Sequence, residues 1–165
     1  MSEQPGNSKL ETRKSKLEYR NSKPQYQNPR VVQIATRKGS AIRDFKDLEA
    51  WRSARELRKE IYRLAQTLPD IEKFGLASQL RRAACSVTAN IAEGFGRFGY
   101  QENVQSCRQA RGSLYEVRDH LTTCVDAGYI VLDEGKRLDK MAQRATQILN
   151  GFVRSTLARK VASHE

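Results

Sequence analysis

Apolar residues recur at alternating steps of three and four along most of the chain beyond residue 44, and this spacing restricts the fold more than any other feature. The clearest run comprises Cys107, Ala110, Leu114, Val117, Leu121 and Cys124. Such steps keep one stripe of a helix turned toward its neighbours, as in left-handed helix bundles. The pattern predicts an all-α protein that needs no strand.

The same spacing predicts four helices separated by short breaks. One proline and several glycines mark the breaks: Pro69, Gly94, Gly96, Gly99 and Gly128. We expect Asp47 to cap the first helix, and acidic residues to open the second and fourth, where they suit the helix dipole. Short connections between long helices favour antiparallel neighbours, so an antiparallel up-down-up-down four-helix bundle is expected over residues 44–160.

Residues 1–43 differ in composition from the rest of the chain. They carry ten basic residues against Glu3, Glu11 and Glu18, a net charge of +7, together with three prolines and many Asn, Gln and Ser residues. Only Val31-Val32-Gln33-Ile34 forms an apolar run. Too little apolar surface is available to offset the entropy of ordering, so this segment is predicted to be a disordered basic tail.

The charge balance indicates the kind of partner. The chain has 30 Lys and Arg against 19 Asp and Glu, a formal net charge of +11 and a pI near 9.9. Such an excess favours polyanions, and nucleic acid first among them. Without a signal sequence or about 20 consecutive apolar residues, we expect a cytoplasmic protein with no membrane partner. Three cysteines without metal-ligand spacing are expected to be buried, reduced thiols, and no metal site is predicted.

The second predicted helix carries few charges on the side opposite its apolar stripe. That outer face contains Ser78, Arg82, Cys85 and Ala89, and between Gly75 and Ala92 the only charges are Arg81 and Arg82. An exposed face of a monomeric bundle is normally charged. We therefore expect another subunit to cover this face, with an exposed small-residue surface that touches nothing as the alternative.

Several motifs resemble a known family. They are Phe45-Lys46-Asp47-Leu48, Phe74-Gly75-Leu76, Gln79-Leu80-Arg81-Arg82-Ala83, Asn90-Ile91-Ala92-Glu93-Gly94, Ala110-Arg111-Gly112-Ser113-Leu114-Tyr115-Glu116 and Gly128-Tyr129-Ile130. Over about residues 44–155 the chain resembles the four helix bundle proteins encoded in intervening sequences of large-subunit ribosomal RNA genes. A relative in that family is the accessory variability determinant of diversity-generating retroelements. That relative is a homopentamer that binds nucleic acid and works with a reverse transcriptase, and the resemblance implies such a pentamer here.

The candidate nucleic-acid-binding residues are arginines of the second and third helices: Arg81, Arg82, Arg97, Arg108, Arg111 and Arg118. Planar guanidinium groups suit phosphate oxygens. Arg82 and Arg111 have an alternative role, in which they pair with Glu93 or Glu116 at a subunit interface. The basic residues of the first helix are interleaved with acids, so an ordinary solvated, salt-bridged face is expected there. Those of the fourth helix have only Asp139 nearby and are expected to be solvated charges, with a second basic strip as the alternative: Lys136, Arg137, Lys140 and Arg144.

An enzyme is not expected. His120 is the only histidine of the predicted bundle, Glu116 one turn before it suggests a surface pair, and carboxylates do not converge. The glycines from Gly94 to Gly99 join two helices, so they do not form a nucleotide cradle, and no cofactor is expected. The sequence predicts a nucleic-acid-binding oligomer, accessory to a reverse transcriptase or ribonucleoprotein. The alternative is a protein-interaction scaffold that does not bind nucleic acid.

Overall fold

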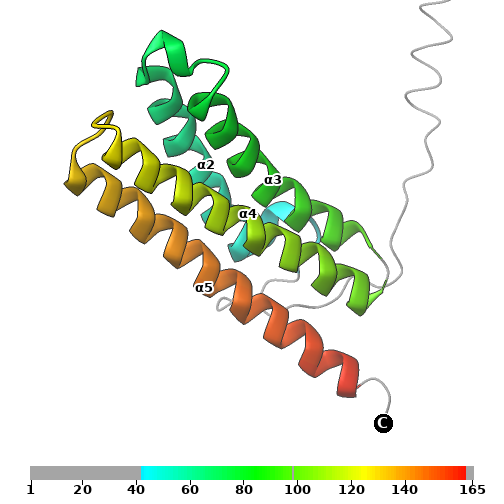
Figure 1. Ribbon diagram of the computed structural model, residues 1–165. Coiled ribbons are helices and arrows are strands. Elements are labelled where there is room, and N and C mark those ends of the chain that lie inside the picture. The colour runs from blue at the N-terminus through cyan, green and yellow to red at the C-terminus, as the bar shows by residue number, and fades with distance from the viewer. Residues whose placement is uncertain (1–41, 98, 163–165) are drawn as a thin grey trace, which may run out of the picture. The chain divides into compact units, whose positions relative to one another are not determined.

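The computed structural model describes residues 42–97 and 99–162, and its regular elements there are all helical, as the apolar spacing predicts. Two short 3-10 helices and four α-helices follow one another (Figure 1): η1 (Phe45–Asp47), α2 (Glu49–Thr67), η2 (Asp70–Glu72), α3 (Leu76–Gly96), α4 (Tyr100–Asp126) and α5 (Leu132–Ala162). The predicted disordered tail lies outside the described residues, apart from its last two positions.

The four helices form an antiparallel bundle with up-down-up-down connections (Figure 1). Helix α2 packs against α3 and α5, and α4 packs against the same two helices, so α2 and α4 lie diagonally across the bundle. The α2–α3 and α4–α5 turns therefore share one end, and the α3–α4 turn lies at the other. The side of α4 that faces away from α2 is therefore on the outside of the bundle.

The core is built from the periodic apolar residues of all four helices. Its largest fully buried side chains include Leu57, Ile61, Leu80, Ile91, Leu114, Leu121, Leu138 and Leu149. Cys107 and Cys124 are buried free thiols, as expected, and burial raises their pKa values to about 12 and about 11. At neutral pH these two thiols therefore stay protonated and unreactive. Cys85 is only half-buried.

The start of the bundle corrects one expectation. Asp47 does not cap α2, whose N-cap is Leu48 and makes no side-chain hydrogen bond. The Asp47 carboxylate instead accepts backbone N–H groups from Arg43 and Asp44, which closes a capping box around η1. Ile42, placed in the tail by composition, is buried in the core. The described core thus begins before residue 44, because the tight η1 turn folds Ile42 back onto the helices.

The two turns at the shared end are joined by Glu72. Its Oε2 accepts the backbone N–H of Leu76 at 2.8 Å, and its Oε1 accepts the Tyr129 hydroxyl at 3.0 Å. Gly128 ends α4 with a φ of +70°, a left-handed conformation that favours glycine. The Glu72 carboxylate thus ties the α2–α3 turn to the start of α3 and, through the Tyr129 side chain, to the α4–α5 turn.

Helices α3 and α4 approach closely at their connected end. A Cβ placed on Gly94 would lie 3.0 Å from the Ser106 Cβ and 3.1 Å from the Asn103 carbonyl oxygen. The Asn103 amide donates to the Gly94 carbonyl at 2.7 Å. Farther along, the hydroxyls of Ser86 and Ser113 are 2.8 Å apart. Small and polar residues thus set the position of α4 against α3.

Candidate nucleic-acid interface

One edge of α4 carries three arginines and a tyrosine at steps of three, four and three. We call Arg108, Arg111, Tyr115 and Arg118 the α4 stripe. At 100° per residue they fall within an arc of about 80°. Arg108 and Arg111 are exposed, and Tyr115 leaves 54% of its surface open to solvent. Burial of Cys107, Ala110 and Leu114 against the other helices turns this edge outward.

Arg118 anchors one end of the stripe to α5. Its Nε and Nη2 lie 2.5 Å and 3.5 Å from the two carboxylate oxygens of Asp139, which also accepts the Gln143 amide. Hydrogen bonding to Arg118 lowers the pKa of Asp139, and the same bond raises the pKa of Arg118. The Arg118 guanidinium also lies 5.4 Å from the centre of the Tyr115 ring. Arg118 is therefore charge-compensated and positions Tyr115.

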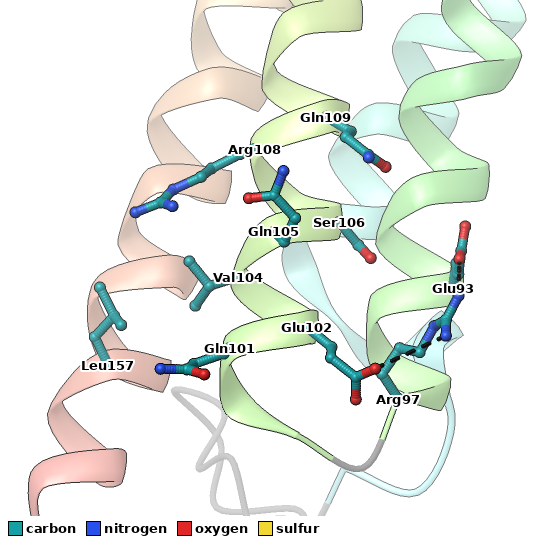
Figure 2. Close-up of a pocket in the computed structure, with 10 residues that line it drawn as sticks. All are labelled: Glu93, Arg97, Gln101, Glu102, Val104, Gln105, Ser106, Arg108, Gln109 and Leu157. Carbon is teal, nitrogen blue, oxygen red and sulfur yellow. Dashed lines mark hydrogen bonds and ion pairs between the residues drawn. The ribbon is translucent and has the colours of Figure 1, made fainter.

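Arg108 and Arg111 differ from Arg118, because neither makes an ion pair with an acid of residues 42–97 or 99–158. Arg108 borders an open hollow of about 640 Å³ over the first half of α4. Figure 2 shows Gln101 and Gln105 on the same helix, with Arg108 and Val104 on the side toward Leu157 of α5. The hollow therefore offers a guanidinium and amide groups to a ligand.

On the opposite side of this hollow, the positive charge of Arg97 is balanced by neighbouring carboxylates. The Arg97 guanidinium lies 2.5 Å from Glu93 and 3.9 Å from Glu102, as the dashed contacts of Figure 2 show. Hydrogen bonding to Glu93 raises the pKa of Arg97. Although the sequence places Arg97 among the phosphate-binding candidates, its charge is balanced by two carboxylates. It therefore contributes little net positive potential at this end of α4.

The two remaining candidate arginines lie on α3, away from the stripe. Arg81 is half-buried and donates to the Lys73 carbonyl at 3.1 Å, whereas Arg82 is exposed. The six predicted arginines thus divide into two groups of three, and only the α4 group shares one edge. Within the chain, Glu93 binds Arg97, and Glu116 lies 3.7 Å from His120 Nε2, while pairing of Arg82 or Arg111 with these acids at a subunit interface stays a prediction.

The predicted subunit interface on α3 is partly covered by the chain itself. Cys85 is half-buried, and its Sγ lies 2.9 Å from the Tyr62 hydroxyl of α2. Ser78 is also half-buried, while Arg82 and Ala89 are exposed. The apparent lack of charge on this helix thus has one cause within the bundle, since α2 packs beside Cys85. Of the four predicted interface residues, Arg82 and Ala89 are the two that are exposed, and a second subunit on this face stays a prediction.

The basic residues of α2 are largely paired with acids, whereas on α5, within residues 132–158, Arg137 is paired and Lys136, Lys140, Arg144 and Arg154 are not. On α2, Lys59 and Arg55 contact Glu56, and Arg63 contacts Glu60. On α5, Arg137 binds both Glu134 and Glu60 of α2, at 2.8 Å and 2.7 Å. The salt-bridged character expected for the first helix is confirmed for these residues.

Tyr115 was not among the nucleic-acid-binding residues that the sequence predicts. Three other aromatic residues, Phe95, Phe98 and Tyr100, lie near the α3–α4 turn in the sequence. Phe95 packs against the core, Tyr100 is half-buried, and Phe98 lies outside the described residues. The signal for Tyr115 was its place between Arg111 and Arg118 on one helical edge. Proteins that bind single-stranded nucleic acid combine basic residues with exposed aromatic rings on which the bases stack, and Tyr115 lies in such surroundings.

The described part of the chain contains neither a metal-binding group of side chains nor a helix that could span a membrane. No group of three or more His, Cys, Asp or Glu residues in it is placed to hold a metal ion. None of its helices combines the length and apolar character needed to cross a bilayer.

Comparison with known proteins gave one family and one structural likeness of note. The family model described as "23S rRNA-intervening sequence protein" matches residues 46–151. The fold is similar to a crystal structure from Bacteroides thetaiotaomicron, a protein of unknown function from the S23 ribosomal protein family. The TM-score is 0.59 at 18% identity, over 63% of this chain and 97% of that chain. A comparison with curated proteins found no match.

Proposed function

Because the chain belongs to the 23S rRNA-intervening sequence protein family, we propose that it is a non-enzymatic, oligomeric bundle that binds RNA or DNA through the α4 stripe. The observation that carries this proposal is the pair of exposed arginines, Arg108 and Arg111, without acidic partners in the described bundle. Each can neutralise one backbone phosphate, and Tyr115 beside them can stack on an unpaired base. Single-stranded or looped nucleic acid suits this combination.

Self-association makes such a small site effective. We infer that the exposed part of α3 around Arg82 and Ala89 contacts a second subunit, and that a pentamer forms, as the resemblance to the accessory variability determinant implies. An oligomer repeats the α4 stripe in every subunit, so contacts with one polyanion gain avidity from effective concentration. This arrangement suits an accessory to a reverse transcriptase or a ribonucleoprotein.

Fluorescence anisotropy across a salt series tests the binding surface. Arg108→Gln combined with Arg111→Gln should weaken binding and reduce the slope of log affinity against log salt. The expected reduction is about 0.7 to 0.9 for each phosphate that the variant no longer neutralises. The matched control combines Arg52→Gln with Arg63→Gln, which removes two charges from α2, diagonally across the bundle. The control should keep the parental slope.

Tyr115→Leu separates stacking from charge. The variant keeps every cation of the stripe, so binding to duplex should change little. Binding to single strands should weaken by about 1–3 kcal/mol, the usual effect of removing one aromatic ring from a stacked base. An equal decrease on duplex and single strands would contradict a stacking role for Tyr115.

The alternative function is a protein-interaction scaffold. One observation favours it: large apolar side chains are exposed at the shared end of the bundle. If the full chain binds neither single- nor double-stranded nucleic acid at low salt, the α4 stripe has no such role. The scaffold is then the better description.

A further inference from the structure

One face of α5 carries exposed basic residues at steps that keep them in line. We call them the α5 strip: Lys136, Lys140, Arg144 and Arg154. At 100° per residue they fall within an arc of about 80°, and from the first to the last they extend over about 27 Å. None of them makes an ion pair with an acid of residues 42–97 or 99–158. The charge of the strip is therefore not compensated by the described bundle.

Two ion pairs show that this strip points away from the bundle. On one side of it, Asp139 binds Arg118 of α4. On the other side, Arg137 binds Glu60 of α2. Around the helix, Asp139 lies about 60° to one side of Lys136 and Arg137 about 100° to the other, so the strip lies between them. The buried residues of α5 lie on the opposite side: Leu138, Ala142, Ala145 and Leu149. The α5 strip is thus the outward face of α5.

The α5 strip and the α4 stripe lie side by side on neighbouring, antiparallel helices (Figure 1). Two contacts fix the register of these helices: Arg118 meets Asp139, and Leu157 borders the same hollow as Val104. Residues 140–144 of the strip therefore lie level with the second half of the α4 stripe. The axes of packed helices are about 8–10 Å apart. One ligand can therefore span both surfaces.

The acid between the two surfaces does not interrupt their positive potential. Asp139 accepts hydrogen bonds from Arg118 and from the Gln143 amide, so its charge is balanced. Within residues 132–158, Asp133 is the only acid on the arc of the strip, and it lies in the first turn of α5. The rest of the strip and the α4 stripe therefore form one basic surface.

The two surfaces differ in the chemistry that they offer to a nucleic acid. The α4 stripe combines arginines with Tyr115, whose ring can stack on an unpaired base. Besides its lysines and arginines, the arc of the α5 strip over residues 134–158 holds only Gln147, Gly151 and Ala158, so it has no aromatic ring. Cations alone bind phosphates whether or not the bases are paired. A duplex offers about one phosphate charge per 1.7 Å of its length, so the α5 strip suits the backbone of a duplex.

Building on the proposed function, on which this inference rests, we propose that the ligand is a duplex that continues into a single strand. The α5 strip binds phosphates of the duplex. The α4 stripe binds the adjoining unpaired nucleotides, with Tyr115 stacked on one base. The junction between the two parts then lies over the Arg118–Asp139 ion pair, which joins the two surfaces. Because both surfaces engage one molecule, the junction should bind more tightly than either part alone, through effective concentration.

Fluorescence anisotropy of the full chain with three RNA probes tests this assignment: a duplex with a single-stranded extension, the blunt duplex, and the extension alone. Lys140→Gln combined with Arg144→Gln should weaken binding to the blunt duplex more than to the extension. On the blunt duplex, the slope of log affinity against log salt should fall by about 0.7 to 0.9 for each lost phosphate contact. Arg108→Gln combined with Arg111→Gln should weaken binding to the extension more than to the blunt duplex.

The matched control is Arg55→Gln combined with Lys59→Gln. It removes one arginine and one lysine at the same spacing from α2, where both contact Glu56. This control should bind all three probes with the parental slope, and circular dichroism confirms that each variant is folded.

The outcomes distinguish this inference from the proposed function. If the variant at positions 140 and 144 binds the blunt duplex with the parental affinity and slope, the α5 strip is not the duplex surface. An equal loss on the duplex and on the extension contradicts the division between the two surfaces. In both cases, weaker binding of the extension by the variant at positions 108 and 111 still supports the α4 stripe. If the parent binds the junction probe no more tightly than the extension alone, the two surfaces do not share one ligand.

Photo-crosslinking to the junction probe gives a second measurement, which changes no charge. A benzophenone amino acid replaces Gln147 on the α5 strip or Gln105 beside Arg108, and both glutamines are exposed. Position 147 should crosslink to the duplex part, and position 105 to the single strand. The same label in place of Gln66, an exposed residue of α2, is the control and should give few crosslinks to either part. Crosslinks from position 147 only to the single strand would overturn the assignment.

Discussion

Replacing Gly94 with alanine tests the close approach of α3 and α4, which sets the position of the α4 stripe. A new Cβ would meet the Ser106 Cβ at 3.0 Å and the Asn103 carbonyl oxygen at 3.1 Å. Both distances are shorter than ordinary van der Waals contact. The carbonyl belongs to the backbone of α4, so it can move only if the helix moves, and the Asn103 amide bond to the Gly94 carbonyl opposes that movement.

The expected magnitude comes from two opposing effects. Alanine favours a helix over glycine by about 1 kcal/mol. Overpacking a buried contact costs about 1–3 kcal/mol, and two short contacts place Gly94→Ala in the upper part of that range. The free energy of unfolding should therefore fall by about 1–2 kcal/mol. For a domain of this size, the melting temperature should decrease by roughly 3–10 °C.

Urea denaturation followed by circular dichroism measures the change, with Gly112→Ala as the matched control. Gly112 is exposed in the middle of α4, and a Cβ there meets nothing within 4 Å. That control should gain about 0.5–1 kcal/mol of stability, because only the helix preference changes. The two glycine replacements should thus have opposite signs. If Gly94→Ala is neutral or stabilising, the close packing of α3 on α4 does not limit the structure.

Three further predictions concern the start of the folded domain, the proposed subunit contact and the Arg118–Asp139 ion pair. Deleting residues 1–41 should preserve helicity and cooperative melting, whereas Ile42→Ala in the full chain should cost about 2–5 kcal/mol, as buried large-to-small changes do. Ala89→Glu should reduce the mass measured by light scattering, because a charge would enter the proposed subunit contact; an unchanged mass would contradict that contact. Arg118 lowers the pKa of Asp139 in the folded protein. The contribution of this ion pair to the free energy of unfolding is therefore complete above the ordinary pKa of an aspartate, near 3.8, and is lost as pH falls through the lowered pKa. Asp139→Asn should therefore flatten the acid side of the stability profile and, by exposing an uncompensated guanidinium, strengthen nucleic-acid binding.

The helices and most of the core could be predicted from the sequence, because apolar periodicity is a local property of the chain. The apolar residues spaced from Cys107 to Cys124 are buried, and the helix ends just before Gly128, both as predicted. At the start of the bundle, the predicted helix cap was wrong. Asp47 has the residue type and position of a helix cap, yet its carboxylate serves the preceding turn, since Ile42 folds back onto the core.

Which charges stay available depends on how the helices pack, and the sequence did not reveal it. Arg97 has Glu93 one turn before it, an i,i+4 pair of the kind that a sequence shows, but Arg118 meets Asp139, 21 residues farther along the chain on another helix, while Arg108 meets no acid of the described bundle. An ion pair between helices requires that they be neighbours in the right register, which no local pattern specifies. The difference is one of range: periodicity acts within a few turns of one helix, whereas charge compensation depends on residues brought together from different helices.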